Sequence, residues 1–303
     1  MQLTFILPVS VGQNSGGSSD LAELARAAET AGMGALAYSE HPAPSRKWLD
    51  NGGHDSFDPL VGLAFCAAAT SRIRLMTLLL VLPYRNPLLA AKSIASLDVL
   101  SGGRLTVVAG AGYLRSEFLA LGVDFEERNA LLDESLAVLD SAWRGEGLSF
   151  TGRHFDAIDQ GLRPPPVQLP RPPIWLGGNS KVAKARAIRM GNGWAAVQAD
   201  ATISGTTRTA ALETIPQIGE AIVAIREDVA SAGGDPRSFQ VQVEAFAGNF
   251  AREDLSYADR LDQLRALAAV GADHAVVHPP TDQIADATRF VREVGARLVS
   301  DLS

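Results

Sequence analysis

The fold is decided by residues 73–110, which read IRLMTLLLVLPYRNPLLAAKSIASLDVLSGGRLTVVAG. Ile73–Val81 is an unbroken apolar run, typical of a parallel strand that is covered on both faces. We predict a helix over Asn86–Leu100, because a proline stands at its first turn and two glycines follow its end. A second apolar strand is predicted over Leu105–Ala109. A strand, a helix and a strand in this order form one unit of a parallel sheet.

The same alternation continues along the whole chain. The predicted strands are Leu3–Pro8, Ala35–Ser39, Ile73–Val81, Leu105–Ala109, Ile174–Leu176, Gly193–Val197, Phe239–Ala247 and His274–Val277. The predicted helices are Asp20–Ala31, Asp58–Thr70, Asn86–Leu100, Arg115–Leu121, Asn129–Arg144, Lys181–Met190, Thr214–Ala232, Leu255–Val270 and Asp282–Val299. Eight strands, each followed by a helix, predict an α/β protein with a (β/α)₈ TIM barrel as one domain over residues 1–303. A doubly wound open sheet is the alternative, because strand order cannot be read from sequence.

Composition excludes several classes of protein. The chain has 303 residues, 47% of them hydrophobic and 20% charged, which suits one large buried core. The net charge is −7 and the basic residues are scattered, so we expect no nucleic-acid partner. We expect no membrane span, since no apolar run reaches the length of about 18 residues that a span needs. The single cysteine, Cys66, lies in an apolar stretch and is expected to be buried, which fits a cytoplasmic protein.

Two segments interrupt the alternation. Ser10–Ser19 is rich in glycine and serine and is predicted to be a mobile loop. Gly145–Pro173 is a long, proline-rich excursion before the fifth strand. An excursion of this length either covers a site or only crosses the barrel as an ordered segment, and the sequence favours neither. Together with Thr202–Glu213, these segments would select the substrate, but they contain no recognisable motif.

Sites of (β/α)₈ barrels lie at the C-terminal ends of the strands. There, Gly177-Gly178-Asn179-Ser180 leads directly into a helix, whose unpaired amides and partial positive charge suit an anion such as phosphate. Asn179 or Ser180 could equally cap this helix without a ligand.

Other strand ends carry further candidates. His41 follows the second strand and could exchange a proton near neutral pH. Gly110 and Gly112 would let a flat ring approach the backbone of strand four. Glu244 and His278 end strands seven and eight, as side chains for the substrate or as structural partners. The sequence has neither an HExxH motif nor paired cysteines, so we predict no metal site.

Several stretches together resemble the luciferase-like monooxygenase superfamily, and in particular its branch that depends on the 5-deazaflavin coenzyme F420. They are LPYRNPLLAAKSIASLDVLSGGRLTVVAGAGYLRSEFLALGVDFEERNALLDESL, FTGRHFD, PPPVQLPRPPIWLGGNS and RAIRMGNGWAAV. The resemblance covers most of Leu3–Val197. It implies a flavin or deazaflavin in the barrel mouth and a bulge in the third strand, often with a non-proline cis peptide, at about Thr77-Leu78-Leu79. It also implies cofactor contacts at Ala111 and Gly112, a phosphate site at Gly177–Ser180, and His41 beside the ring.

The sequence departs from this family at two positions. Sugar-phosphate and alcohol dehydrogenases of the family carry an acidic residue just after the strand-four glycines, where this chain has Tyr113. Trp48 matches their active-site tryptophan in type, but its spacing from His41 differs. We therefore expect a small organic substrate other than a sugar phosphate or a simple alcohol.

Three functions stay open at this point. The first is a hydride-transferring oxidoreductase that uses coenzyme F420, with His41 as the catalytic residue. The second is a monooxygenase that uses FMN and oxygen. The third is a protein that binds flavin or deazaflavin without catalysis. The resemblance also suggests a possible homodimer.

Overall fold

The computed structural model describes residues 1–9, 17–144 and 147–303. The loop expected over Ser10–Ser19 falls mostly outside this range, and its last residues already belong to helix α1 (Gly17–Thr30). Within the described residues, no helix is both long and apolar enough to cross a membrane.

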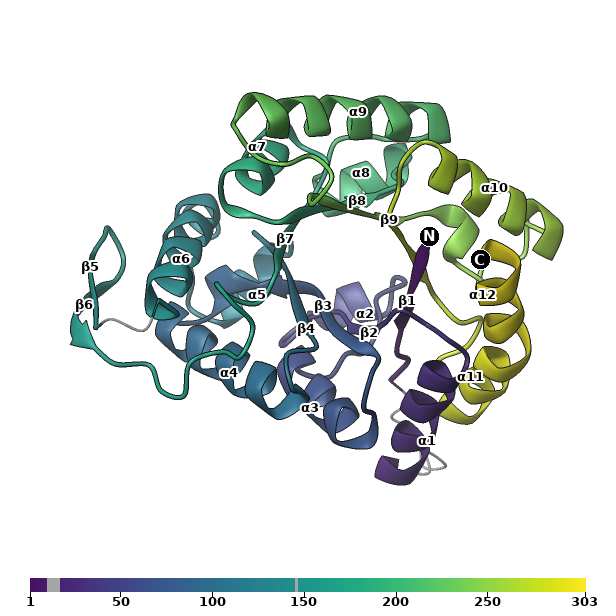
Figure 1. Cartoon of the computed structure of the whole chain (residues 1–303), viewed down its shortest axis with the longest axis horizontal. Coiled ribbons are helices and arrows are strands. Elements are labelled where there is room, and N and C mark those ends of the chain that lie inside the picture. Colours follow the sequence, from purple (N-terminus) through teal and green to yellow (C-terminus); the bar gives the residue numbers. More distant parts are fainter. Residues whose placement is uncertain (10–16, 145–146) are drawn as a thin grey trace.

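The described strands form a closed barrel of eight parallel strands (Figure 1). Around the barrel they follow the order β1-β2-β3-β4-β7-β8-β9-β10, and β1 pairs with both β2 and β10. This closure confirms the predicted barrel and excludes the open sheet. The barrel strands are β1 (Gln2–Ile6), β2 (Ala35–Tyr38), β3 (Arg74–Val81), β4 (Leu105–Gly110), β7 (Ile174–Gly177), β8 (Gly193–Val197), β9 (Gln240–Glu244) and β10 (His274–Val277).

Helices surround the barrel as an outer ring (Figure 1). After α1 they are α3 (Pro59–Ala69), α4 (Pro87–Ser101), α6 (Arg128–Ala142), α7 (Lys181–Met190), α9 (Ile215–Ser231), α10 (Tyr257–Ala269), α11 (Ile284–Phe290) and α12 (Ala296–Leu302). A π-helical turn, Val291–Gly295, joins the last two, which sequence had predicted as one helix. Short elements lie in the loops: α2 (Arg46–Leu49), η1 (Leu82–Tyr84), α5 (Arg115–Ala120), α8 (Ala201–Thr207) and η2 (Phe246–Gly248). Of these, only α5 was predicted, and η2 takes up the end of the strand predicted over Phe239–Ala247, which stops at Glu244.

Local sequence explains where the elements begin and end. Helix α4 begins where the Asn86 side chain accepts a hydrogen bond from the Leu88 amide at 2.9 Å, and it ends at Gly102, whose φ is 66°. One cluster of the barrel core combines small side chains such as Ala35 and Ala37 with the larger Met76 and Trp175. A larger apolar layer lies between the strands and the helices. All six residues of β4 are buried, as expected for a parallel strand with both faces covered.

Strand β3 carries the bulge that the resemblance implied. Its register with β4 shifts between Thr77 and Leu80, and the Leu78–Leu79 peptide bond is cis. The Thr77 hydroxyl donates to the carbonyl of Val108 at 2.9 Å and accepts from the amide of the same residue at 3.0 Å. Thr77 therefore replaces a missing backbone pair, and the bulge aims Leu78 and Leu79 at the barrel mouth.

The long excursion contains a two-stranded antiparallel hairpin, β5 (Leu148–Thr151) and β6 (Asp156–Gln160), which lies outside the helix ring beside α6 (Figure 1). The returning chain is attached to Asp98 near the end of α4, whose carboxylate accepts from the amides of Val167 and Gln168. The Gln168 side chain donates to the carbonyl of Leu105, at the start of β4. The excursion is thus an ordered crossing at the N-terminal end of the barrel, and none of its described residues lines the cavity at the mouth.

Candidate functional site

A cavity of about 1310 Å³ opens at the C-terminal ends of the strands. Residues at or just after the end of every barrel strand line it, as the fold predicts. It is large enough for a cofactor ring and a small substrate together, since single ligand pockets usually measure about 300–1,000 Å³. The predicted site residues that line it are His41, Leu78, Leu79, Ala111, Gly112, Tyr113, Gly177, Gly178, Ser180, Glu244 and His278.

Three predicted residues do not line this cavity. Thr77 is fully buried in its hydrogen bonds to β4. Asn179 is 4% exposed, and its side-chain amide bridges the backbone of Val197 and Ala210. Trp48 stands behind His41, with the two ring centres 4.4 Å apart. These three residues therefore position their neighbours, and the different spacing of Trp48 still brings it against His41.

His41 is held by a buried carboxylate, Glu117 of α5. The Nδ1 atom of His41 lies 3.3 Å from a Glu117 oxygen, and the Glu117 side chain is 1% exposed. Glu117 also accepts from the Tyr84 hydroxyl at 3.0 Å and from the Ala43 amide at 3.2 Å. This arrangement fixes the imidazole by Nδ1, while Nε2 has no partner among the described residues. A histidine oriented by a carboxylate is a recurrent design for proton transfer.

A second histidine–carboxylate pair, Glu244 and His278, lines the same cavity from β9 and the end of β10. His278 Nε2 lies 2.9 Å from Glu244, whose side chain is 40% exposed. Burial acts to raise the pKa of the Glu244 carboxyl, but the hydrogen bond from His278 and the charges of His278 and His54 outweigh it and lower that pKa. Glu244 thus stays ionised at neutral pH.

His54 and Tyr113 line the cavity with the two pairs. Burial, followed by the charges of His41 and His278, lowers the pKa of His54 to about 4, so this imidazole is neutral at pH 7. Its Nε2 lies 3.0 Å from the Ser39 hydroxyl. Burial, followed by the charges of Glu117 and Glu244, raises the pKa of Tyr113 to about 12, so the phenol keeps its proton. Tyr113 can therefore donate a hydrogen bond in the cavity.

The turn before α7 combines a cap with free amides. The Ser180 hydroxyl accepts from the Ala183 amide at 3.1 Å, which makes Ser180 the N-cap. The Asn179 amide is occupied by the Thr209 hydroxyl at 2.8 Å. In the described part of the chain, this leaves the amides of Ser180, Lys181 and Val182 without acceptors. The capping interpretation of the turn is confirmed, and the three amides leave the predicted anion site geometrically possible.

The glycines at the mouth make room for one side chain, Leu79. A Cβ added at Gly110 would come within 2.8 Å of Leu79, and one added at Gly177 within 2.5 Å. At Gly112, with φ of 77°, an added Cβ would meet Val81 and Phe118. Gly110 and Gly177 thus leave room for the Leu79 side chain of the β3 bulge to pack over β4 and β7.

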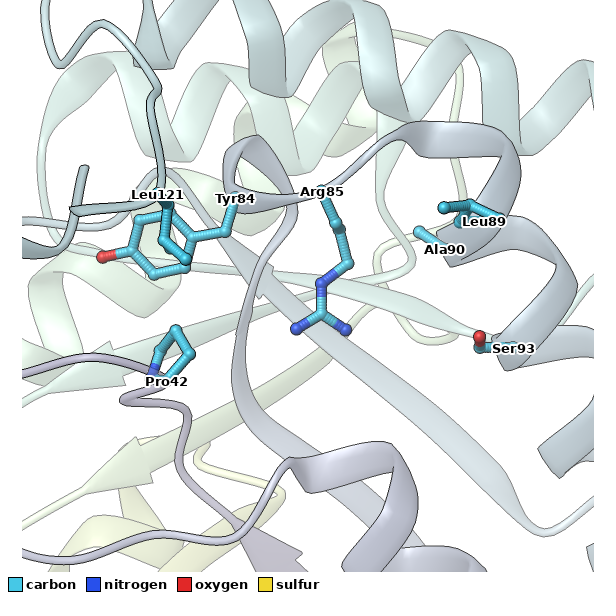
Figure 2. A pocket seen from close by; sticks show the side chains of 7 residues that line it. All are labelled: Pro42, Tyr84, Arg85, Leu89, Ala90, Ser93 and Leu121. Carbon is cyan, nitrogen blue, oxygen red and sulfur yellow. The ribbon is translucent and has the colours of Figure 1, made fainter. Parts of the chain in front are cut away.

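A smaller hollow of about 260 Å³ lies beside η1, as Figure 2 shows. In that view the Tyr84 ring and the Arg85 side chain leave η1 in different directions. Arg85 forms an ion pair with Glu40, which also accepts from the Val81 amide at 2.5 Å. This network holds η1 beside the mouth, and the hollow is separate from the site residues predicted from sequence.

The sequence matches the family model described as luciferase-like monooxygenase over residues 1–298. The chain belongs to the luciferase-like monooxygenase family. It is 30% identical over 226 residues to the F420-dependent hydroxymycolic acid dehydrogenase of Mycobacterium tuberculosis, which covers 74% of this chain and 57% of that protein. It is 34% identical over 126 residues to the FMNH(2)-dependent dimethylsulfone monooxygenase of Pseudomonas putida, covering 41% of this chain and 34% of that protein.

Among solved structures, an F420-dependent secondary alcohol dehydrogenase in complex with an F420-acetone adduct superposes with a TM-score of 0.75. The match covers 100% of this chain and 99% of that one at 16% identity, so it supports the fold alone. The relatives in this luciferase-like family thus include enzymes of both cofactor types, and a flavin or a deazaflavin is plausible here.

Sequence reasoning missed several residues of this luciferase-like site. In the sequence, Glu117 lies in a short predicted helix and looks like a surface residue. His54 lies in a polar loop without a motif. The Gln242 side chain, fully buried and lining the cavity, has an amide nitrogen that finds no hydrogen-bond partner among the described residues.

Proposed function

We propose that this protein is an oxidoreductase that transfers a hydride between the deazaflavin coenzyme F420 and a small organic substrate with a carbonyl or hydroxyl group. The observation that carries the proposal is His41, held by the buried Glu117 at the cavity wall. Reduction of a carbonyl needs a proton on oxygen together with the hydride, and His41 is suited to supply it.

The residues present fit such a coenzyme. The cavity provides the volume, the bulge at Leu78 and Leu79 provides an apolar surface for a flat ring, and the free amides of Ser180–Val182 suit its phosphate. Buried at the cavity wall, the Gln242 amide nitrogen lacks a partner and would be satisfied by a ring carbonyl.

When bound, the coenzyme supplies the hydride, and the protein supplies position and proton transfer. Glu117 fixes the His41 ring by Nδ1, so that Nε2 remains for the substrate oxygen. Trp48 packs against His41 from behind and limits its rotation. In the oxidation direction, the same Nε2 would accept the hydroxyl proton, and the negative charge of Glu117 would stabilise the imidazolium that forms.

The alternative is an FMN-dependent monooxygenase that uses oxygen. The match to the dimethylsulfone monooxygenase favours it, and the amides before α7 would serve an FMN phosphate equally well. A non-catalytic flavin or deazaflavin carrier is the third possibility, although an oriented His–Glu pair has no purpose in a carrier.

Titration with each cofactor tests the proposal. We expect oxidised F420 to bind and to be reduced in the presence of a suitable alcohol. The reduction would be measured as a loss of the visible absorbance of F420. Reduced FMN should cause no oxygen consumption above the rate without protein. Protein-dependent oxygen uptake with reduced FMN, and no turnover of F420 across a panel of alcohols and carbonyl compounds, would establish the monooxygenase instead.

A further inference from the structure

The charged side chains of the cavity are divided between two halves of its mouth. Among the described residues, the basic ones that line the cavity follow β4, β7 and β8, and they are Arg128, Arg186 and Arg208. The neighbouring strands β9, β10, β1 and β2 carry the other half, whose described lining residues include no arginine or lysine. Four acids line this half, from the end of β9 and from the loops after β2 and β10: Asp50, Asp55, Glu244 and Asp282. We call these four residues the acidic half.

Positive charge does not balance the acidic half. The two other acids that line the cavity already have partners, which are Arg85 for Glu40 and His41 for Glu117. Within the described residues, Glu244 pairs with His278 and the three aspartates of the acidic half form no ion pair. Burial, followed by the charges of two neighbouring histidines, lowers the pKa of His54 to about 4, so this ring adds no positive charge at pH 7. The acidic half is therefore a region of negative potential, which attracts cations.

Glu244 is the member of the acidic half that is placed to contact a ligand inside the cavity. It stands at the end of a barrel strand and lines the cavity, and its side chain is 40% exposed. The Oε1 atom of Glu244 lies 2.9 Å from Nε2 of His278, whereas Oε2 has no hydrogen-bond partner among the described residues. An ionised carboxylate with one free oxygen suits a cationic group that also donates hydrogen bonds.

The buried Gln242 relates Glu244 to the proposed coenzyme. The Gln242 side-chain oxygen accepts from the Thr4 hydroxyl at 2.8 Å, and its amide nitrogen has no partner among the described residues. This unpaired donor indicates a ligand in the cavity, independently of the acidic half. Residues 242 and 244 point to the same face of β9 and are separated by roughly 6–7 Å along the strand, with Glu244 nearer the mouth. A ring bound at Gln242 therefore leaves Glu244 at the level of the substrate.

His54 lies between the two histidine–carboxylate pairs. The ring centres of His41 and His54 are 5.0 Å apart. On its other side, His54 is close enough to His278 and Glu244 for their charges to act on its pKa. A substrate with its oxygen at His41 can therefore extend past His54 to Glu244.

We propose that the substrate carries a cationic nitrogen group, such as an ammonium, which binds the free oxygen of Glu244 while the reacting carbonyl or hydroxyl oxygen lies at His41. His278 orients the carboxylate and is a positioning residue. The three aspartates of the acidic half are exposed, so they attract the cation to the mouth without contacting it in the bound state. The inference rests on the proposed function, because it uses His41 as the place of the reacting oxygen.

Three benzyl alcohols that differ in one substituent test this preference for a cation. In para-(aminomethyl)benzyl alcohol the amine is protonated at pH 7, para-(hydroxymethyl)benzyl alcohol is its neutral isostere, and para-(hydroxymethyl)benzoate is an anion. NMR titration of the full chain without coenzyme would give the three dissociation constants. We expect the cationic alcohol to bind about tenfold more tightly than its neutral isostere, and the anion to bind most weakly. Raised salt should reduce the difference.

Three variants locate the preference. Glu244→Gln removes the charge and keeps the size of the side chain, so it should remove most of the advantage of the cationic alcohol. Asp282→Asn should reduce this advantage less, because Asp282 is an exposed residue of the acidic half. Glu23→Gln is the matched control, since Glu23 pairs with Arg292 and does not line the cavity. It should leave all three dissociation constants within twofold.

The outcomes separate the inference from the proposed function. Equal affinity for the cationic and neutral alcohols, or no binding of the cationic one, overturns the inference, while turnover of other alcohols with F420 leaves the proposed function standing. A preference for the cation that survives Glu244→Gln also overturns it, because another group would then bind the cation. Oxygen uptake with reduced FMN and no turnover of F420 overturns the proposed function, and with it a reacting oxygen at His41. The titration would still establish or exclude the cation site at Glu244.

Discussion

The two histidine–carboxylate pairs of the cavity contain the same chemical groups but are held differently. Glu117 is 1% exposed and accepts hydrogen bonds from three groups, whereas Glu244 is 40% exposed and accepts one, from His278. His41 is correspondingly 9% exposed and His278 is 29% exposed. Burial and multiple hydrogen bonds fix the first pair in place, which suits the proton transfer proposed for His41, while the second pair is more exposed and has fewer contacts.

The largest expected difference is in turnover. His41→Ala should lower kcat by about 10²–10⁴-fold, the usual contribution of a general acid or base. His278→Ala should lower it less than about tenfold. Steady-state kinetics with F420 and an accepted alcohol would measure both. His154→Ala is a control, because His154 lies outside the cavity and contacts Glu127. Comparable losses at His41 and His278 would remove the distinction between the pairs.

The second difference is in folding stability. Glu117→Ala leaves the Tyr84 hydroxyl, the Ala43 amide and His41 without their acceptor, so it should lower the free energy of unfolding by about 3 kcal/mol. Glu244→Ala removes one half-exposed partner and should cost about 0.5 kcal/mol. Urea unfolding followed by circular dichroism would compare them. Glu117→Gln keeps an acceptor and should recover part of the loss; a stable Glu117→Ala protein would contradict the role of burial.

The smallest effect concerns the protonation of His54. Its pKa of about 4 is held down by burial and then by His41 more than by His278. His41→Ala should therefore raise the pKa of His54 more than His278→Ala does. The imidazole resonances of His54, followed by NMR between pH 3 and pH 8, would show which variant has the larger pKa increase. A pKa increase of equal size in both variants would contradict the prediction.

The depressed pKa of His54 also determines in which direction the stability of the folded state changes with pH. A histidine in an unfolded chain has a pKa of about 6.5. Between about pH 6.5 and 4, His54 is therefore protonated in the unfolded chain but neutral in the folded protein. His54 therefore makes the folded state less stable as the pH falls through this window, and contributes no such loss above it. His54→Gln should flatten the pH dependence of the thermal midpoint there.

The sequence was sufficient to predict the barrel because the same strand–helix pattern recurs along the chain. Parallel strands buried on both faces must be apolar, as β3 and β4 largely are, and some helix ends are marked by a glycine, such as Gly102 after α4. The hairpin β5–β6 was missed because β5 alternates apolar and polar residues over only four positions and β6 is mainly polar and exposed.

The site could be predicted only in part. Residues at strand ends, such as His41 and Gly178, lie where topology places them, and most of them line the cavity. Contacts between residues that are distant in the sequence depend on the folded structure. Nothing in the sequence indicates that His41 contacts Glu117, which is 76 residues away. Around Phe125, likewise, three arginines meet from the ends of three different helices: Arg115, Arg128 and Arg208.

The hairpin β5–β6 has a practical consequence. Its tip, residues 152–155, is bonded to Glu127 and Glu134 near the start of α6, whereas its base at Leu148 and Gln160 follows the end of α6, away from the mouth. A dye, an affinity tag or an immobilising linker placed beside the exposed Gln160, at the base of this hairpin, would leave the mouth unobstructed. The protein thus carries a natural attachment point, from which a surface-bound sensor could be built with its cavity facing the solution.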